Sequence, residues 1–148
     1  YKIAEDGELC MHGDSIMLGY YKDPEATAEV IDADGWFHTG DLARKDEDGY
    51  YFLTGRKKNL IILDSGENIN PEELEGIVGK CEAVKECVVK EMGKKIGVVV
   101  YCDEDKQQQV RDFITEANRT LPLYKRMSAV EFSTEPLPRN GAGKLLRQ

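Results

Sequence analysis

The first third of the chain alternates between apolar and polar residues. Residues 7–12 and 15–21 alternate with the two-residue period of short strands. A longer stretch, "ADGWFHTGDLARKDEDGYYFLTGR", is typical of two more strands joined at Asp48 and Gly49. This dipeptide favours a tight turn, because both residues accept the backbone angles that hairpins require. The pattern therefore predicts β-structure over most of the region up to residue 54.

A short helix interrupts this β-rich region. Asp23 precedes Pro24, and a capping carboxylate followed by a first-turn proline is a common start of a helix. We expect this helix to end near Ile31. The first part of the chain is therefore expected to be all-β with one small helix.

The period of the pattern changes after Arg56, where two amphipathic helices become evident. Asn70 caps the first helix, which starts at Pro71, and the second helix spans about residues 105–118. Each helix has one apolar face at helical spacing. These faces consist of Leu74, Ile77, Val78 and Cys81 in the first helix, and of Val110, Phe113, Ile114 and Ala117 in the second.

Strands alternate with these helices. "NLIILDSGENIN" indicates an apolar strand and a polar loop, two further strands turn at residues 93–95, and a last strand spans residues 127–132. The resulting order is β-α-β-β-α-β. We therefore expect an α+β fold, in which a β-rich first part is followed by a compact α+β domain.

Composition and charge exclude several classes of protein. A chain of 148 residues suits one domain or two small ones, and 41% hydrophobic residues is typical of a globular protein. The net charge of −8 argues against non-specific binding to nucleic acid, so any anionic ligand must be held by local basic groups. The sequence shows no apolar run of about 18 residues and no signal peptide.

The histidines and cysteines do not indicate a metal site. His12 and His38 are far apart in the sequence and have no evident companion ligands. The cysteines lack CxxC spacing and lie mostly in apolar stretches; they are Cys10, Cys81, Cys87 and Cys102. We expect them to be reduced core residues of a cytoplasmic protein.

The stretch "PLPRNGAGKLLR", residues 136–147, places Lys144 after two glycines. It is not a Walker-type phosphate loop, because Pro138 replaces the first glycine and Leu145 replaces the hydroxyl residue that would bind magnesium. What remains is a mobile, glycine-hinged loop that is able to carry an ammonium group to another surface. The ordinary alternative is a solvated tail lysine.

Two further stretches contain candidate chemistry, and each has an ordinary alternative. "HTGDL" places Asp41 directly after a glycine at a strand end, where an aspartate also stabilises turns. "GRKKNLIILDSGENINPEELE" contains Arg56, whose ordinary alternative is a surface ion pair. The same stretch contains Gly66, whose ordinary alternative is a loop glycine with positive φ.

In this order and spacing, the three stretches resemble the AMP-forming acyl-CoA synthetases, the adenylate-forming family that includes luciferases and peptide-synthetase adenylation domains. The resemblance covers nearly the whole chain, and residues 55–75 are most similar to the long-chain fatty acid branch. It implies that residues 1–57 end a large AMP-binding domain and that residues 58–148 form a mobile C-terminal domain.

The resemblance implies a two-step reaction. A carboxylate attacks the α-phosphate of Mg-ATP to give an acyl-adenylate and pyrophosphate, and the thiol of coenzyme A then displaces AMP. By resemblance, Asp41 accepts hydrogen bonds from the ribose hydroxyls, and Arg56 adds charge-assisted donors nearby. Lys144 matches the lysine that stabilises the charge of the adenylation transition state.

The resemblance also implies that the C-terminal domain rotates between the two half-reactions. The hinge is Lys58, whose ordinary alternative is a solvated lysine at a strand edge. After rotation Lys144 is withdrawn, and the loop with Gly66 and Glu67 lines the channel for the pantetheine arm of coenzyme A. Ile62 stands where some relatives carry a second lysine, so a second basic group for thioester formation is not supported.

Substrates and partners follow from the same resemblance. They are a fatty acid or another carboxylate, ATP and coenzyme A, with magnesium bound outside this chain. The family's phosphate loop, magnesium motif and acyl pocket belong upstream of residue 1, so the chain alone is expected to be inactive. An adenylation module that loads a carrier protein and a non-catalytic binding relative are the alternatives. The enzyme is expected to be cytoplasmic, with peripheral membrane contact left open.

Overall fold

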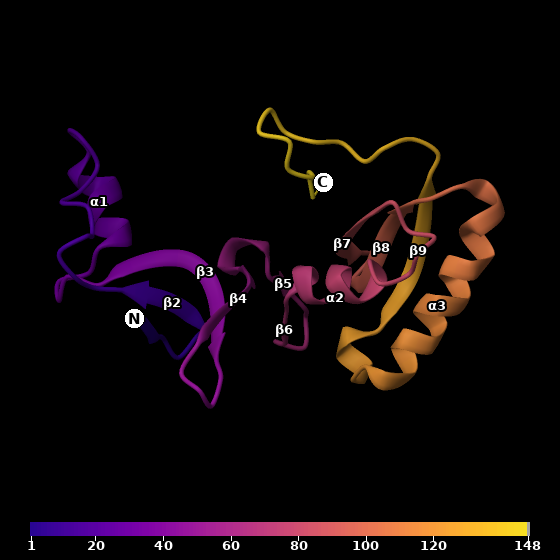
Figure 1. Ribbon diagram of the computed structural model, residues 1–148, viewed down its shortest axis with the longest axis horizontal. Coiled ribbons are helices and arrows are strands. Elements are labelled where there is room, and N and C mark those ends of the chain that lie inside the picture. The colour runs from indigo at the N-terminus through magenta and orange to yellow at the C-terminus, as the bar shows by residue number, and fades with distance from the viewer. Residues whose placement is uncertain (148) are drawn as a thin grey trace. The chain divides into compact units, whose positions relative to one another are not determined.

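The computed structural model describes residues 1–147 and divides the chain into two units, Tyr1–Asn59 and the residues from Leu60 onward (Figure 1). The first unit is mostly β-strand, whereas the second combines helices and strands. The α+β class expected from the sequence is therefore confirmed. Within residues 1–147, no helix is both long enough and apolar enough to cross a membrane.

An antiparallel four-stranded sheet forms the framework of the first unit (Figure 1). Its strands follow the order of the sequence: β1 (Lys2–Ile3), β2 (Glu8–Met11), β3 (Phe37–Lys45) and β4 (Tyr51–Arg56). The predicted hairpin between β3 and β4 is confirmed. Asp46 N–H donates to Tyr50 O, Gly49 N–H donates to Asp46 O, and Gly49 has φ +92°. A turn that ends in a left-handed glycine therefore makes this connection.

Two short helices complete the first unit. Helix α1 spans Pro24–Val30, as the sequence predicts, and the Asp23 side chain accepts a hydrogen bond from the Ala26 N–H. A 3-10 helix, η1, spans Lys57–Asn59 and follows β4 directly.

The strand predicted over residues 15–21 is wrong. In the structure the Tyr20 N–H donates to Thr27 Oγ1 of α1 at 2.9 Å, and Tyr20 makes only an isolated bridge to Asp23. A Cβ atom on Gly19 would lie 2.8 Å from Thr27 Cγ2, so the backbone passes directly against the helix. The alternation in this segment accompanies contact with α1 and not strand pairing.

The second unit has the predicted order of strands and helices with one more strand, β6, which lies in the segment predicted to be a polar loop (Figure 1). Its elements are β5 (Ile61–Ile62), β6 (Asn68–Ile69), α2 (Pro71–Val78), β7 (Glu86–Met92), β8 (Lys95–Tyr101), η2 (Glu104–Lys106), α3 (Gln107–Thr120), η3 (Leu123–Lys125) and β9 (Met127–Ser133). β5 pairs with β6, whereas β7, β8 and β9 form a separate sheet in that order. β7 and β8 are antiparallel, and β9 is parallel to β8. Gly93 and Lys94 both have positive φ, as the tight β7–β8 turn requires.

One hydrophobic core joins α2, α3 and the β7-β8-β9 sheet. The predicted helix faces are confirmed, because both helices bury their apolar side chains in this core. The buried members include Leu74 and Val78 of α2, Val110 and Ile114 of α3, and Val89, Val98 and Val100 of the sheet. Burial of these faces is the main stabilising term for the second unit.

The C-terminal segment packs against the other face of the same sheet. Val88 and Val99 lie opposite each other on β7 and β8, and they line a small hollow together with Leu137 and Leu146. Successive side chains of a strand point to opposite faces, so this is the face turned away from the helices. The segment after β9 is therefore held on the sheet.

Replacing Leu74 by Ala is expected to lower the free energy of unfolding of the second unit by about 2–5 kcal/mol, because the change leaves a cavity in the core. Leu74 is 0% exposed. Urea denaturation followed by circular dichroism measures the effect. Leu123→Ala is the matched control, since Leu123 is 78% exposed. Equal losses in the two variants would contradict the assignment of Leu74 to the core.

Candidate functional site

Asp41 and Arg56 lie opposite each other on β3 and β4. Arg56 Nε is 2.8 Å from Asp41 Oδ1, and the two side chains are 46% and 28% exposed. The pair is thus formed in the folded chain and still accessible to a ligand. A carboxylate beside a guanidinium offers acceptors for sugar hydroxyls and donors for anionic groups.

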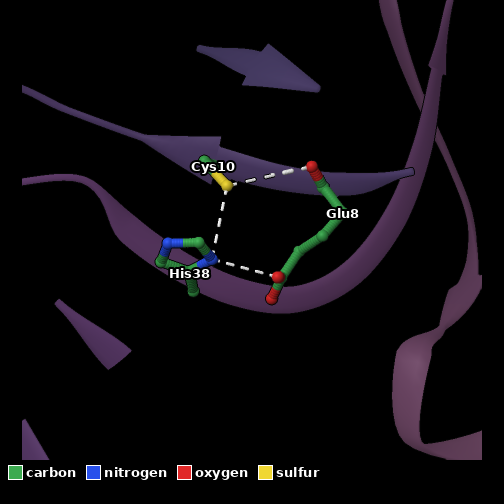
Figure 2. Close-up of side chains that lie close together, drawn as sticks. All are labelled: Glu8, Cys10 and His38. Carbon is green, nitrogen blue, oxygen red and sulfur yellow. Dashed lines mark hydrogen bonds and ion pairs between the residues drawn. The ribbon is translucent and has the colours of Figure 1, made fainter. Parts of the chain in front are cut away.

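A buried carboxylate, Glu8, contacts the neighbours of this pair. Glu8 Oε1 accepts the Gly40 N–H at 2.8 Å, and Oε2 lies 3.0 Å from both His38 Nδ1 and Lys57 Nζ. Figure 2 shows Glu8 and Cys10 on β2 facing His38 on β3. Glu8 is not among the site residues predicted from the sequence. An acidic residue beside apolar neighbours in a strand was the only available signal.

These contacts favour the charged forms of Glu8 and His38. Burial acts to raise the pKa of Glu8, but hydrogen bonds from His38, Lys57 and the Gly40 amide outweigh it, so the pKa lies below its ordinary value. The hydrogen bond to Glu8 raises the pKa of His38, and Asp32 adds to this effect. The contribution of Glu8 to stability is lost as pH falls through its lowered pKa, and that of His38 as pH rises through its raised pKa. The Glu8–His38 ion pair therefore stabilises the fold most at pH values between the pKa of Glu8 and the pKa of His38.

Glu8, Cys10 and His38 also bring three potential metal-ligand atoms within 4.8 Å of one another (Figure 2). The expectation that the histidines have no companion ligands is therefore wrong for His38, because strand pairing brings β2 and β3 together. Two observations favour a hydrogen-bonded network. The Lys57 ammonium contacts the same Glu8 oxygen that faces His38, and burial raises the pKa of the Cys10 thiol, which disfavours the metal-binding thiolate.

Lys58, the predicted hinge, is exposed and lies in η1. The first unit ends at Asn59, the next residue along the chain. The hinge role itself stays a prediction.

Gly66 lies in the turn between β5 and β6. Its N–H donates to Leu63 O at 2.8 Å, its φ is +93°, and a Cβ atom there would meet no described atom within 4 Å. Positive φ alone accounts for a glycine at this position. The Ser65 hydroxyl donates to the carboxylate of Glu67. The open space next to Gly66 would also suit a residue that lines a channel. The role of Gly66 in a coenzyme A channel therefore stays a prediction.

Lys144 stands at the end of a hydrogen-bonded turn. Asn140 N–H donates to Lys144 O at 2.8 Å, Gly143 N–H donates to Asn140 O at 2.9 Å, and Gly143 has φ +78°. Asn140 Oδ1 accepts the Lys144 N–H. The backbone bonds repeat the pattern of the turn between β3 and β4. The predicted loop thus forms a closed turn, in which Asn140 and Gly143 occupy positions that favour one. Its mobility stays a prediction.

Acidic side chains of the second unit hold this C-terminal segment on both sides of Lys144. Before the lysine, Glu86 of β7 accepts the Leu137 N–H at 2.7 Å and lies 2.5 Å from Arg139 Nη2. After it, the Arg147 guanidinium pairs with the carboxylates of Glu72 and Glu75 on α2; these partners are part-buried. These contacts are not predictable from local sequence patterns, because the partners are far apart along the chain.

The structure therefore brings together only some of the predicted site residues. Asp41 and Arg56 form a pair in the first unit. Gly66 and Lys144 lie on separate turns of the second unit.

Comparisons with known proteins identify relatives over nearly the whole chain. The long-chain-fatty-acid–CoA ligase of Salmonella typhimurium is 41% identical over 149 residues, which cover 98% of this chain and 26% of that protein. The probable 4-coumarate–CoA ligase 2 of Dictyostelium discoideum is 36% identical over 99% of this chain and 27% of that protein. The chain thus spans about a quarter of the length of these relatives.

A solved structure has the same fold. The A domain of carboxylic acid reductase from Segniliparus rugosus, in complex with AMP and a co-purified carboxylic acid, matches with a TM-score of 0.78 and 29% identity. The match covers 95% of this chain and 25% of that one. Residues 58–148 match the family model of the AMP-binding enzyme C-terminal domain. Because this match covers more than half of the chain, the protein belongs to the family of AMP-binding enzymes, with their C-terminal domain at residues 58–148.

Proposed function

We propose that this chain is the C-terminal part of an ATP-dependent, AMP-forming fatty acyl-CoA synthetase. The parent enzyme joins a carboxylate to ATP to give acyl-AMP and pyrophosphate, and then transfers the acyl group to coenzyme A. The observation that carries the proposal is the Asp41–Arg56 pair, which the β3–β4 register places 2.8 Å apart at an accessible position. The similarity to the Salmonella ligase supports the choice of a fatty acid and coenzyme A.

Asp41 and Arg56 would bind the nucleotide. A ribose diol presents two hydroxyl donors, and a carboxylate is able to accept both. Arg56 holds the Asp41 carboxylate through Nε, which leaves the guanidinium charge beside the sugar. We assign the ribose of ATP and of acyl-AMP to this pair.

Lys144 would act in adenylation. The attacking carboxylate and the α-phosphate both carry negative charge, so an ammonium between them stabilises the transition state more than the separate reactants. Lys58 would be the hinge that brings this lysine to the reaction and withdraws it. Gly66 and Glu67 would then line the coenzyme A channel, where the open space above Gly66 gives room for the pantetheine arm.

The magnesium ion that accompanies ATP would bind outside this chain. The cluster of potential ligands among the described residues supplies a thiol and an imidazole beside one carboxylate, whereas Mg²⁺ prefers oxygen ligands. No step assigned to these residues passes through the ion. ATP and coenzyme A are the other small molecules that the reaction requires.

The substrate, the acyl acceptor and the location in the cell are less narrowly defined than the type of reaction. The Dictyostelium 4-coumarate–CoA ligase is nearly as similar as the fatty acid ligase, so another carboxylate is the alternative substrate. A module that transfers its acyl group to an acceptor other than coenzyme A is a second candidate, favoured by the fold match to a carboxylic acid reductase. We propose a cytoplasmic enzyme, consistent with its free cysteines, and peripheral contact with a membrane for a fatty substrate.

Carboxylate-dependent exchange of label between pyrophosphate and ATP tests the first half-reaction. The intact parent protein is expected to catalyse the exchange with a fatty acid, and the 148-residue chain alone is expected to show none. Exchange by the isolated chain would contradict the assignment of the phosphate and acyl sites to residues outside it. Failure of the intact protein to exchange with any carboxylate would overturn the proposed function.

A further inference from the structure

We propose that Glu8 is a positioning residue for nucleotide binding, because its buried carboxylate bonds the residues that adjoin Asp41 and Arg56. The inference rests on the proposed function of that pair. Among the described contacts, the Glu8 side chain touches neither Asp41 nor Arg56. It would act on them through the residues next to them in the sequence.

The contacts of Glu8 reach β3, which carries Asp41, and the first residue after β4, which carries Arg56. One carboxylate oxygen accepts the N–H of Gly40, the residue before Asp41. The other binds the ammonium of Lys57, the residue after Arg56, at 3.0 Å. A single side chain on β2 thus bonds the backbone before Asp41 and the side chain of the residue after Arg56.

The strand ladder is irregular where Glu8 acts. The pairing of β2 with β3 shifts between Glu8 and Cys10, and the pairing of β3 with β4 shifts between Leu42 and Ala43. Gly40 lies within the first of these shifts, between His38 and Leu42 on β3; it has φ +71° and donates to the Glu8 side chain. Such bulges re-aim a side chain at the expense of regular backbone bonds. The carboxylate supplies the contact that orients the backbone of the following residue.

A second side chain completes the support of this segment. Thr39 Oγ1 accepts the Asp41 N–H at 3.1 Å and donates to Leu9 O at 2.7 Å. His38, the residue before Thr39, donates to Glu8 through Nδ1 (Figure 2). Residues 38–41 are therefore held to β2 largely through side chains.

Burial makes the Glu8 network resistant to rearrangement. The Glu8 side chain is 5% exposed, whereas Asp41 is 28% exposed. A buried carboxylate that loses a donor keeps its desolvation penalty without compensation, so the three donors stay in place. The accessible Asp41–Arg56 pair is thus supported by a buried carboxylate, for whose hydrogen bonds water does not easily compete.

In the intact enzyme, Glu8→Gln tests the inference. Gln keeps the size of the side chain but has one acceptor oxygen and no charge, so His38, Gly40 and Lys57 are no longer held together. We expect the KM for ATP to rise roughly 10-fold to 100-fold, as small displacements of binding groups do, with kcat at saturating ATP near wild type.

A nucleotide without ribose hydroxyls separates positioning from a general structural defect. Dissociation constants for ATP and for 2′,3′-dideoxy-ATP are measured by isothermal titration calorimetry. Glu8→Gln is expected to raise the dissociation constant for ATP and to leave that for 2′,3′-dideoxy-ATP nearly unchanged. In an Asp41→Ala background, Glu8→Gln is expected to cause no further loss for ATP, because its effect passes through Asp41.

Asp6→Asn is the matched control. Asp6 Oδ2 also binds Lys57 Nζ, at 2.6 Å, but its side chain is 49% exposed and its recorded contacts do not include Gly40 or His38. This variant is expected to bind ATP like wild type. If Glu8→Gln does not fold, Lys57→Met carries the test, and a smaller loss confined to ATP is expected because only one donor is removed.

The outcomes distinguish this inference from the proposed function. Equal weakening of both nucleotides, or additive losses with Asp41→Ala, would overturn the positioning role. Wild-type enzyme that binds ATP and 2′,3′-dideoxy-ATP equally well would instead overturn the ribose assignment of Asp41.

Discussion

Lys144→Ala in the intact enzyme is expected to slow acyl-adenylate formation by roughly 10²–10³-fold, the usual effect of removing one preorganised electrostatic group. The ammonium offsets negative charge that accumulates only as the carboxylate approaches the α-phosphate. The rate of thioester formation from supplied acyl-AMP is expected to stay near wild type. In that step the thiol attacks the acyl carbon, and no carboxylate approaches the phosphate. Single-turnover assays of the two half-reactions measure both rates.

Two variants control for this change. Lys94→Ala removes an exposed lysine from another turn of the second unit and is expected to leave both half-reactions unchanged. Lys144→Arg keeps the charge but replaces a compact ammonium by a planar group, so only part of the adenylation rate should return. Equal loss of both half-reactions in Lys144→Ala would show that the lysine supports the fold and not adenylation.

Asp41→Ala is expected to raise the KM for ATP at least about 10-fold to 100-fold, since one hydrogen bond to a charged group is worth about 1.5–3 kcal/mol. The change also leaves the Arg56 guanidinium without its partner at 2.8 Å. Initial rates of adenylation over a range of ATP concentrations measure the effect. Kcat at saturating ATP is expected to fall less, because the ribose contact exists before and during the chemical step.

Asp48→Ala is the control for this variant. Asp48 is an exposed aspartate at the tip of the same β3–β4 hairpin, and its removal is expected to leave the ATP dependence unchanged. An ATP dependence that is also unchanged in Asp41→Ala would contradict the ribose assignment.

The elements that the sequence predicts correctly are those whose signals are local. Asp23 and Asn70 cap their helices as expected, and the apolar spacing of α2 and α3 matches their buried faces. Alternation alone was a weaker guide. Residues 15–21 alternate but contact α1, because pairing depends on a partner strand that local pattern does not specify.

Site residues with family motifs could be predicted, whereas their supports could not. Asp41 and Arg56 were predicted separately, and only strand register shows that they form a pair. Glu75 ends the stretch 55–75 that carries the family resemblance, but no role was predicted for it or for Glu8 and Glu86, because their partners lie far away in the sequence. A surface carboxylate and a buried one look alike in a sequence, because the distinction depends on tertiary packing.

The closed turn around Lys144 has a consequence for how catalysis is timed. Carboxylates of β7 and α2 hold the flanking arginines, so the segment that carries Lys144 is tied to the second unit on both sides. In the proposed roles of Lys58 and Lys144, bringing the ammonium to the reacting groups or withdrawing it would move the second unit as one folded body, with its hydrophobic core intact. Adenylation and thioester formation would then take place in two different positions of this unit and could not occur at the same time. The proposed coenzyme A channel would form only after Lys144 has been withdrawn.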